Sequence, residues 1–482
     1  MAAPRAELSD DRPTTSAFWL GRLDARPLAV FRIVLGAIVL FDLGDRLRDF
    51  HAFYTDLGLV ERSVLTSAVA WSAAGWMGES WQAGVVFALG ALGAVGLVLG
   101  FKTRWSTLLT FWAVLSIQER NLAIFDGGDQ TLRLLLFWSI FVDLGARYSL
   151  DARRGRQDTI AAVPVRLLQL QVVLIHFFAG VSKNGATWKT GTAVFRAMQD
   201  RTFGRSGGEW LLAYPTLCTW LTYGTLAIEI CFPFLVCSPW LHSRLRAFAV
   251  GAALLLHLGI FSLMRIGMFS FVMPLSLLAL VRAAWWPAWR RTPPVADEGE
   301  PQSTMASRWI WFPVSLAVLI TWTLAAVQTP ALPLRILRAL GLQQQWKLFA
   351  PDPAGVRRTW YVPGVLGDGQ LVDVGAEIAP RFIEDYPVRY TRWAKWKSHL
   401  AGPGIRRLDQ TGRYLCRLWK GLHPDGPALV ELDLEYATEP VVDPGQTRLA
   451  ATMTRALHQP CVRPPKRVEQ QPEQEEAHDG PD

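Results

Sequence analysis

The chain has 482 residues, 51% of them hydrophobic, and a positive mean hydropathy. Its 22 tryptophans are hard to fit into a soluble globule, because soluble domains are about 45–50% apolar and carry fewer of the aromatic residues that collect at bilayer interfaces. The net charge of +8 is spread over loops, which fits the basic bias of cytoplasmic loops better than nucleic-acid binding. The composition therefore predicts a membrane protein and excludes an ordinary soluble domain.

Apolar runs that approach the length of a membrane span recur along the first two thirds of the chain. A span needs roughly 20 apolar residues. The runs lie at 27–43, 83–101, 104–118, 131–147, 165–182, 211–237, 245–264, 266–284 and 309–328. They predict about nine transmembrane helices. The expected fold is mainly α: a polytopic membrane helical bundle with a small extramembrane α+β domain at the C-terminus.

Ionisable side chains interrupt these runs or lie at their ends. A central Arg or Asp costs about 2.5–3.5 kcal/mol on the insertion scale, so we expect these side chains to face the bundle interior. Any one of them is either functional or pairs with another as structural glue. The residues are Arg32, Asp42, Arg133, Asp143, His176, Glu229, His257 and Arg265.

Basic residues are concentrated in alternate loops, which predicts an orientation. By the positive-inside rule these loops and the N-terminus are cytoplasmic, and the C-terminal region lies outside a bacterial inner (plasma) membrane. Three arginines in a loop assigned to the outside contradict this rule, and an interfacial helix near 190–203 would accommodate them. The cytoplasmic groups are Lys102 and Arg104, Arg153 to Arg156, Arg244 and Arg246, and Arg282 to Arg291; the exceptions are Arg196, Arg201 and Arg205.

Four segments are expected along the chain. Residues 1–26 form a cytoplasmic N-terminal arm without a cleavable signal peptide. Residues 27–330 form the transmembrane bundle, which includes a proline-rich acidic linker at 293–306. Residues 331–460 form the extracytoplasmic α+β domain, and 461–482 form a charged, disordered tail.

The C-terminal domain has its own short-range signals. Thr359–Val362 and Gln370–Val374 flank a Gly-Asp-Gly turn and predict a β-hairpin. Helices are expected at 392–400 and 413–421, and a strand at 429–436. The basic aromatic run at 389–397 is interpreted as a solvated helix face with two buried tryptophans, the alternative being contact with lipid headgroups. Only Cys416 and Cys461 could pair outside, so a disulfide framework is not expected.

The sequence lacks the common catalytic motifs. It has no CxxC pair, no HExxH and no glycine-rich phosphate loop. Its one GxSxG match, Gly204-Arg-Ser-Gly-Gly208, lies in the loop between the apolar runs at 165–182 and 211–237, not at the strand-to-helix turn that a nucleophile elbow requires. Zinc proteases, nucleotide-driven pumps and serine hydrolases are therefore excluded, and no metal site is expected.

One polar stripe ends the apolar run at 165–182. Gln169, His176 and Lys183 are spaced seven apart, so a helix returns them to nearly the same face. If this face points inward, Lys183 lies at the outer mouth of a cavity, where desolvation favours the neutral amine, a usable base. The alternative is a lysine that extends from the helix end to the lipid headgroups.

Four motifs carry a family resemblance that covers roughly residues 27–440. Phe177-Phe-Ala-Gly-Val-Ser-Lys183, followed by Trp188 and Gly191, resembles the catalytic segment of the vitamin K-dependent γ-carboxylase family. Ile266-Gly-Met-Phe269 after His257 resembles a second motif of that family. Tyr54-Thr-Asp-Leu-Gly-Leu59 and Trp346-Lys-Leu-Phe-Ala-Pro-Asp-Pro353 are similar to segments of the wider horizontally transferred transmembrane (HTTM) domain superfamily.

The resemblance implies an enzyme and a set of site residues. Lys183 would be the catalytic base that deprotonates reduced vitamin K (menaquinol or phylloquinol), and His257 would hold the quinone or an oxyanion. The remaining quinone-site residues implied are His176, Trp188, Asp129, Met268 and Phe269. O2 and CO2 would be co-substrates, and the partners would be the lipid bilayer and a glutamate-containing peptide, with no nucleic acid.

Two alternatives stay open. Animal members carry a histidine where this chain has Asp129, and an anion there would not stabilise an enolate, so quinone epoxidation alone is one outcome. The second is a non-catalytic superfamily member with an immunity, sensing or scaffold role, in which Lys183 and His257 only close a polar network. A proton-coupled transporter is disfavoured because no inverted repeat is visible.

Overall fold

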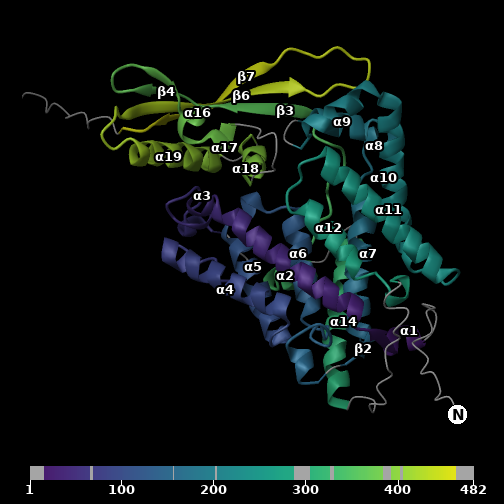
Figure 1. Cartoon of the computed structure of the whole chain (residues 1–482). Helices are drawn as coiled ribbons and strands as arrows, with labels where there is room; N and C mark the ends of the chain where they lie inside the picture. The colour runs from purple at the N-terminus through teal and green to yellow at the C-terminus, as the bar shows by residue number, and fades with distance from the viewer. Residues whose placement is uncertain are drawn as a thin grey trace, which may run out of the picture.

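The structure is a computed structural model that describes residues 16–65, 69–155, 157–200, 203–286, 304–325, 331–383, 392–401 and 405–462. Figure 1 shows a helical bundle with a module of strands and helices at one end. The expectations for residues 1–15, for the linker at 293–303 and for the tail at 463–482 lie outside the described residues.

Long apolar helices build the bundle. Within the described residues, five are long and apolar enough to cross a membrane: α2 (Arg26–Leu47), α4 (Ser80–Leu99), α7 (Ala162–Val181), α10 (Pro215–Val236) and α11 (His242–Leu263). The other predicted runs also contain helices: α5 (Thr103–Arg120), α6 (Gly127–Ser139), α12 (Phe269–Leu278) and α14 (Thr304–Ala325).

The chain is thus a mainly helical membrane protein, but nine transmembrane helices are not confirmed. Helices α6 and α12 are too short to span a bilayer of ordinary thickness. Helix α5 has the length, but its last turn carries Gln118, Glu119 and Arg120, all of which are buried. Helices α6 and α12 are apolar because they pack inside protein, which a hydropathy pattern alone does not distinguish from contact with lipid.

The loops predicted to be cytoplasmic gather at one end of the bundle. Strands β1 (Arg22–Asp24) and β2 (Thr159–Ala161) pair there. The Lys102 amide donates to Asp151 at 2.9 Å, and helix α1 (Ser16–Leu20) brings the Phe18 ring against His242. The C-terminal module covers the opposite end (Figure 1). This arrangement agrees with the predicted alternation of loops.

Short helices form the end of the bundle that faces the C-terminal module. They are α3 (Phe50–Tyr54), α8 (Ala186–Thr190), α9 (Ala193–Gln199) and α15 (Ala331–Ala339). Helix α9 occupies the place of the predicted interfacial helix. Its Arg196 forms an ion pair with Asp443 of the C-terminal module, with a nitrogen to oxygen distance of 2.6 Å, so this exception to the positive-inside rule has a protein partner.

The C-terminal module packs helices under one five-stranded antiparallel sheet. The long strand β6 is central: β3 and β4 pair in succession along one of its edges, and β7 pairs along the other. Helix α19 contacts β6 and β7. The elements are β3 (Val356–Tyr361), β4 (Pro363–Leu366), β5 (Leu371–Asp373), α16 (Val374–Ile378), α17 (Pro380–Ile383), α18 (Arg392–Leu400), α19 (Ile405–Leu422), β6 (Leu429–Pro440) and β7 (Thr452–Pro460).

The predicted hairpin is present, but the prediction of which residues form its first strand was wrong. β4 pairs with β5 across the turn, where Gly369 has a φ of 87°. The residues expected to form the first strand, 359–361, belong to β3 and pair with β6. A tight turn joins only the residues next to it, so β4 takes that place. Helix α18 is confirmed, α19 begins earlier than predicted, and β6 is confirmed and longer.

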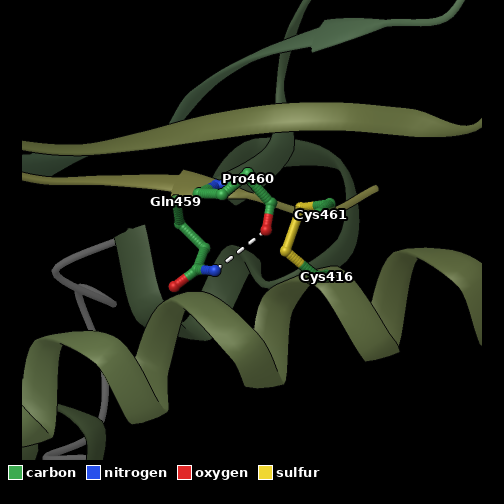
Figure 2. Close-up of a disulfide and its surroundings, with 4 residues drawn as sticks. All are labelled: Cys416, Gln459, Pro460 and Cys461. Carbon is green, nitrogen blue, oxygen red and sulfur yellow. Dashed lines mark hydrogen bonds between the residues drawn. A yellow bond between two sulfur atoms is a disulfide. The ribbon is translucent and has the colours of Figure 1, made fainter. Parts of the chain in front are cut away.

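A disulfide joins Cys416 of α19 to Cys461, just after β7 (Figure 2). The pairing that the sequence left as the only one possible outside is therefore formed. It fastens the helix layer to the edge strand of the sheet. Disulfides persist in oxidising compartments, so the bond agrees with the predicted external position of this module.

Candidate functional site

Lys183 lies just beyond the C-terminal end of α7 and is buried, with 6% of its surface exposed. Its Nζ donates to the Ala179 carbonyl at 3.0 Å, where the helix end carries partial negative charge. It also donates to both carboxylate oxygens of Glu229, at 2.9 and 2.7 Å. The side chain therefore points into protein, and the alternative of a lysine extended to the headgroups does not hold.

Gly180 explains how Glu229 of α10 reaches the lysine. A Cβ atom at Gly180 would lie 3.0 Å from the Glu229 Cβ and 2.9 Å from Ile230 Cγ1. Only a residue without a side chain lets α7 and α10 approach so closely. The Ala-Gly dipeptide of the motif thus creates the contact that pairs the lysine.

Trp188 covers the lysine from the other side. The Lys183 ammonium lies 5.4 Å from the centre of its ring, within range of a cation–π interaction. The indole N–H donates to the Phe349 carbonyl at 2.9 Å, which fixes the orientation of the ring. Gly191, with a φ of 77°, ends α8 immediately afterwards. Gly180, Trp188 and Gly191 of the first motif therefore each shape the surroundings of Lys183.

The motif around Phe349 fastens this loop from the C-terminal side. The Gly185 amide donates to the Pro351 carbonyl, and the Thr187 hydroxyl and amide both donate to Asp352. Burial alone would raise the pKa of the Asp352 carboxyl, but these hydrogen bonds outweigh it and hold the pKa below its usual value. Two motifs far apart in the sequence thus form one structural unit around Lys183.

Two histidines lie side by side next to this unit. His176 Nε2 is 3.3 Å from His257 Nε2, and the His176 ring stacks on Phe232 at 4.2 Å between centroids. Both imidazoles are buried and within electrostatic range of the Lys183 ammonium. The structure therefore brings together Lys183, His176, Trp188 and His257 from the first two motifs. With Glu229, these residues are here called the Lys183 cluster.

The hydrogen bonds assign the tautomers of this pair when both rings are neutral. His176 Nδ1 is 2.9 Å from the Val172 carbonyl, so it carries the proton and its Nε2 accepts from His257 Nε2. His257 Nδ1 is then an acceptor. This atom is buried and has no hydrogen-bond partner among the described residues. A buried polar atom without a partner is costly, so a hydroxyl group of a ligand would be favoured there.

Met268 and Phe269 stand at the start of α12, and Phe269 contacts His257. The Phe269 ring packs edge-on against it, with centroids 5.9 Å apart. A Cβ atom at Gly128 would lie 2.4 Å from the Phe269 amide, so α12 packs directly on the first turn of α6. Both residues of the second motif are buried.

Asp129 lies in a different cluster. Its two oxygens accept from Arg46 and from Arg392, and both arginines also bind Asp42. The result is a closed ring of two carboxylates and two guanidiniums, here called the ion-pair ring, and Arg46 also donates to the Tyr54 hydroxyl. The helix that carries Asp129 approaches the second motif at Gly128, which packs on Phe269.

Most of the ionisable side chains in the apolar runs are buried, as the sequence predicted, and they bind other groups of the protein. Arg32 donates to backbone carbonyls of α4 and of Tyr148, Arg133 pairs with Glu119, and Arg265 donates to the Gly204 carbonyl. Asp143 departs from the prediction because it is exposed, just past the end of α6.

Sequence reasoning missed two residues that complete these clusters. Glu229 was noted as a charge but not as the partner of Lys183, and nothing in its own sequence context specifies that pairing. Arg392 was expected on a solvated helix face, and the structure buries it in the ion-pair ring. Within the described part of the bundle, Asp42 and Asp129 have only Arg46 as a partner, and this excess of acid would have signalled that a further cation is needed. Among the described residues, no group of three or more His, Cys, Asp or Glu could hold a metal ion.

The fold and geometry define a polytopic helical membrane protein with charged clusters buried at one end. The chain belongs to the HTTM domain family, which matches residues 21–285. This membership supports the resemblance to the superfamily of HTTM proteins and vitamin K-dependent carboxylases. The uncharacterized protein YitO of Bacillus subtilis (strain 168) is 26% identical over 161 residues, which cover 31% of this chain and 52% of that protein. The chain thus spans about half the length of this curated relative, and no solved structure matches.

Proposed function

We propose that the protein deprotonates a reduced quinone at the Lys183 cluster, either to drive glutamate carboxylation or for epoxidation alone. The observation that carries the proposal is the unpartnered Nδ1 of His257, buried beside a paired lysine. The cluster combines aromatic rings with polar atoms, which suits an aromatic diol such as menaquinol or phylloquinol. With O2, the reduced quinone supplies the strong base that carboxylation by CO2 requires.

Lys183 and Glu229 would act as a pair. Inside a low-dielectric bundle the desolvation penalty of an ion pair largely offsets its attraction. The neutral pair of amine and carboxylic acid is therefore close in free energy to the charged pair of ammonium and carboxylate. When the proton moves from the lysine to Glu229, the amine becomes a base that accepts the proton of a quinol hydroxyl. His257 Nδ1 would accept a hydrogen bond from the diol and orient it, with His176 fixing the tautomer.

The site lies where an apolar substrate and a dry reaction are compatible. Trp188 and Phe269 are buried and limit access of water to the lysine and the histidine, and a quinone is soluble in the bilayer that surrounds the helices. In this proposal the protein is an integral membrane protein with the cluster on the external side, and a glutamate-containing peptide would approach from there.

One observation favours a non-catalytic role instead. The three N–H groups of the Lys183 ammonium are matched by three protein oxygens, so the lysine is fully satisfied without a substrate. A superfamily member with an immunity, sensing or scaffold function would use such a pair only to hold α7 against α10.

The test is conversion of reduced vitamin K to its epoxide by the purified protein on admission of O2. Lys183→Arg is the decisive variant, because arginine keeps the positive charge facing Glu229 but cannot give up its proton. Lys189→Arg is the matched control, since Lys189 is exposed on α8, shortly after Lys183 in the chain. Catalysis predicts epoxide from the wild type and the control, and at least a hundredfold loss in Lys183→Arg at an unchanged melting temperature, in line with removal of a general base.

Two results would decide against the catalytic proposal. The first is no epoxide from folded wild type with any of several quinols. The second is epoxide formation at the same rate by wild type and Lys183→Arg. Either result moves the assignment to the non-catalytic role.

A further inference from the structure

A polar pocket at the junction of the bundle and the C-terminal module is separate from the Lys183 cluster. Its volume is about 570 Å³. Gln130 and Arg133 of α6 line it, together with Arg338 of α15, Lys347 and Lys395 of α18. The acidic residues that line it are Glu119, which pairs with Arg133, and Asp126. With four basic and two acidic side chains, the pocket has an excess of positive charge.

Two side chains that line this pocket each carry a buried donor without a protein acceptor. The donors are Gln130 Nε2 and one terminal nitrogen of Arg133, and neither has a hydrogen-bond partner among the residues described. The two side chains are only 7% and 6% exposed. Because positions three apart lie on one face of a helix, both donors belong to the face of α6 that lines the pocket.

The other nitrogens of Arg133 are already engaged. Its Nε donates to Gln118 at 2.7 Å, and a terminal nitrogen donates to Glu119 at 2.9 Å and to the Gly341 carbonyl at 3.3 Å. The Phe125 ring lies 4.8 Å from the guanidinium carbon. The guanidinium is therefore held in place with one edge left over, which is a preorganised arrangement for an oxyanion.

The neighbouring surface points to a ligand that comes from the membrane. Helix α15 supplies Arg338 to the pocket, while its Leu332 and Ile336, one turn apart, are 68% and 42% exposed. An exposed apolar stripe beside basic residues is typical of a helix that lies in the bilayer interface. The Trp71 indole donates to the Ala339 carbonyl at the end of this helix.

An apolar groove begins next to the pocket. Val69 lines the pocket, and two residues further on Trp71 lines a groove of about 580 Å³ whose walls are almost entirely apolar. Its other residues include Trp105 and Phe111 of α5 and Phe141 after α6. A molecule with an anionic head and an apolar chain would fit the two sites together.

We propose that this pocket binds the phosphate headgroup of an anionic membrane lipid, whose acyl chain lies in the adjoining groove. Gln130 and Arg133 would donate to the phosphate oxygens, and Arg338, Lys347 and Lys395 would neutralise its charge. The bound lipid would join α6, α15 and α18, and thus fasten the C-terminal module to the bundle. The site does not depend on quinone chemistry at Lys183.

The experiment uses the full chain in phosphatidylcholine nanodiscs with an increasing fraction of phosphatidylglycerol, and measures the melting temperature. A ligand that binds the folded state raises it by mass action. We expect the rise in wild type to fall by more than half in the double variant Arg338→Gln/Lys395→Gln. Arg335→Gln is the matched control on α15, because Arg335 is exposed and does not line the pocket, and it should retain the full rise.

Gln130→Leu adds a test that depends on the direction in which the melting temperature changes. Because its buried Nε2 has no protein partner, this near-isosteric change should raise the melting temperature in pure phosphatidylcholine and abolish most of the response to phosphatidylglycerol. The proposal fails if phosphatidylglycerol has no effect on wild type, or if Arg335→Gln loses the rise as fully as the double variant. An equal rise with inorganic phosphate in phosphatidylcholine nanodiscs would also overturn it, in favour of a site for a free anion.

Discussion

The ion-pair ring and the Lys183 cluster both bury charge at the same end of the bundle, but they leave different atoms available. In the ring, all four oxygens of Asp42 and Asp129 accept from Arg46 or Arg392. Among the atoms of the ring in the described structure, Arg392 Nε is the one buried nitrogen without a partner. In the Lys183 cluster, the acceptor Nδ1 of His257 is unused. The carboxylate oxygens of the ring are therefore all engaged, whereas the cluster offers a ligand a hydrogen-bond acceptor.

The two regions also attach to the C-terminal module differently. The ring includes Arg392 of α18, buried within the bundle. On the Lys183 side, Arg196 of α9 pairs with Asp443, and both side chains are partly exposed. Buried charge pairs are costly to break, and exposed ones contribute little. The comparison implies that the ring holds the module in place and the exposed pair only assists.

The largest effect is expected from Arg392→Met. It leaves two buried carboxylates facing Arg46 alone, and breaking a buried pair from one side costs about 3–5 kcal/mol. The measurement is denaturant or thermal unfolding of the protein in detergent. Arg406→Met, which changes an exposed arginine of α19, should stay close to wild type. Equal stability of Arg392→Met and wild type would contradict a structural role for the ring.

A second effect is expected from reduction of the disulfide that stabilises the module carrying Arg392. Cys416 and Cys461 are 45 positions apart, and closing a loop of this length contributes about 2–4 kcal/mol. The double variant Cys416→Ser/Cys461→Ser should unfold at a lower temperature than Cys231→Ser, which replaces an exposed free cysteine. Mass spectrometry of protein alkylated in intact cells tests the compartment, because free thiols at both positions would contradict an external module.

A third prediction distinguishes the lysine pair as structure from the lysine as a base. Lys183→Met should lower stability by about 1–3 kcal/mol, because Glu229 loses its buried partner, takes up a proton and is left with unmet hydrogen bonds. Lys183→Met/Glu229→Gln should recover most of that loss while remaining inactive. Thermal unfolding and epoxide formation are measured on the same samples. Activity that returns together with stability would show that the lysine acts only by holding α7 and α10.

The smallest effect is expected from the exposed pair. The hydrogen bond from Arg196 lowers the pKa of the Asp443 carboxyl. Because the folded-state pKa is the lower one, the contribution is present above about pH 4 and is lost as the pH falls through that pKa. Solvent screening keeps it below about 1 kcal/mol. Asp443→Asn should remove this part of the pH dependence, as seen in melting temperatures between pH 3 and pH 7, and a large loss would contradict the assisting role.

The sequence by itself determined that this is a helical membrane protein and where its apolar helices lie, because burial in lipid or in a bundle needs continuous apolar runs with backbone groups satisfied inside each helix. It also indicated Lys183, because an ionisable group at the end of such a run is costly and rarely accidental. The turn at 367–369 and helix 392–400 followed from local chemistry as well.

Tertiary structure alone decided which charges meet. Glu229 is 46 positions from Lys183, and Arg392 is 263 positions from Asp129. Their pairing depends on the close approach of α7 and α10 at Gly180 and on the docking of α18 against the bundle. The number of helices that cross the membrane also depends on packing, since α6 and α12 are apolar through burial against protein. A one-dimensional pattern records that a residue is apolar or charged, whereas its partner is set by how the helices pack in three dimensions.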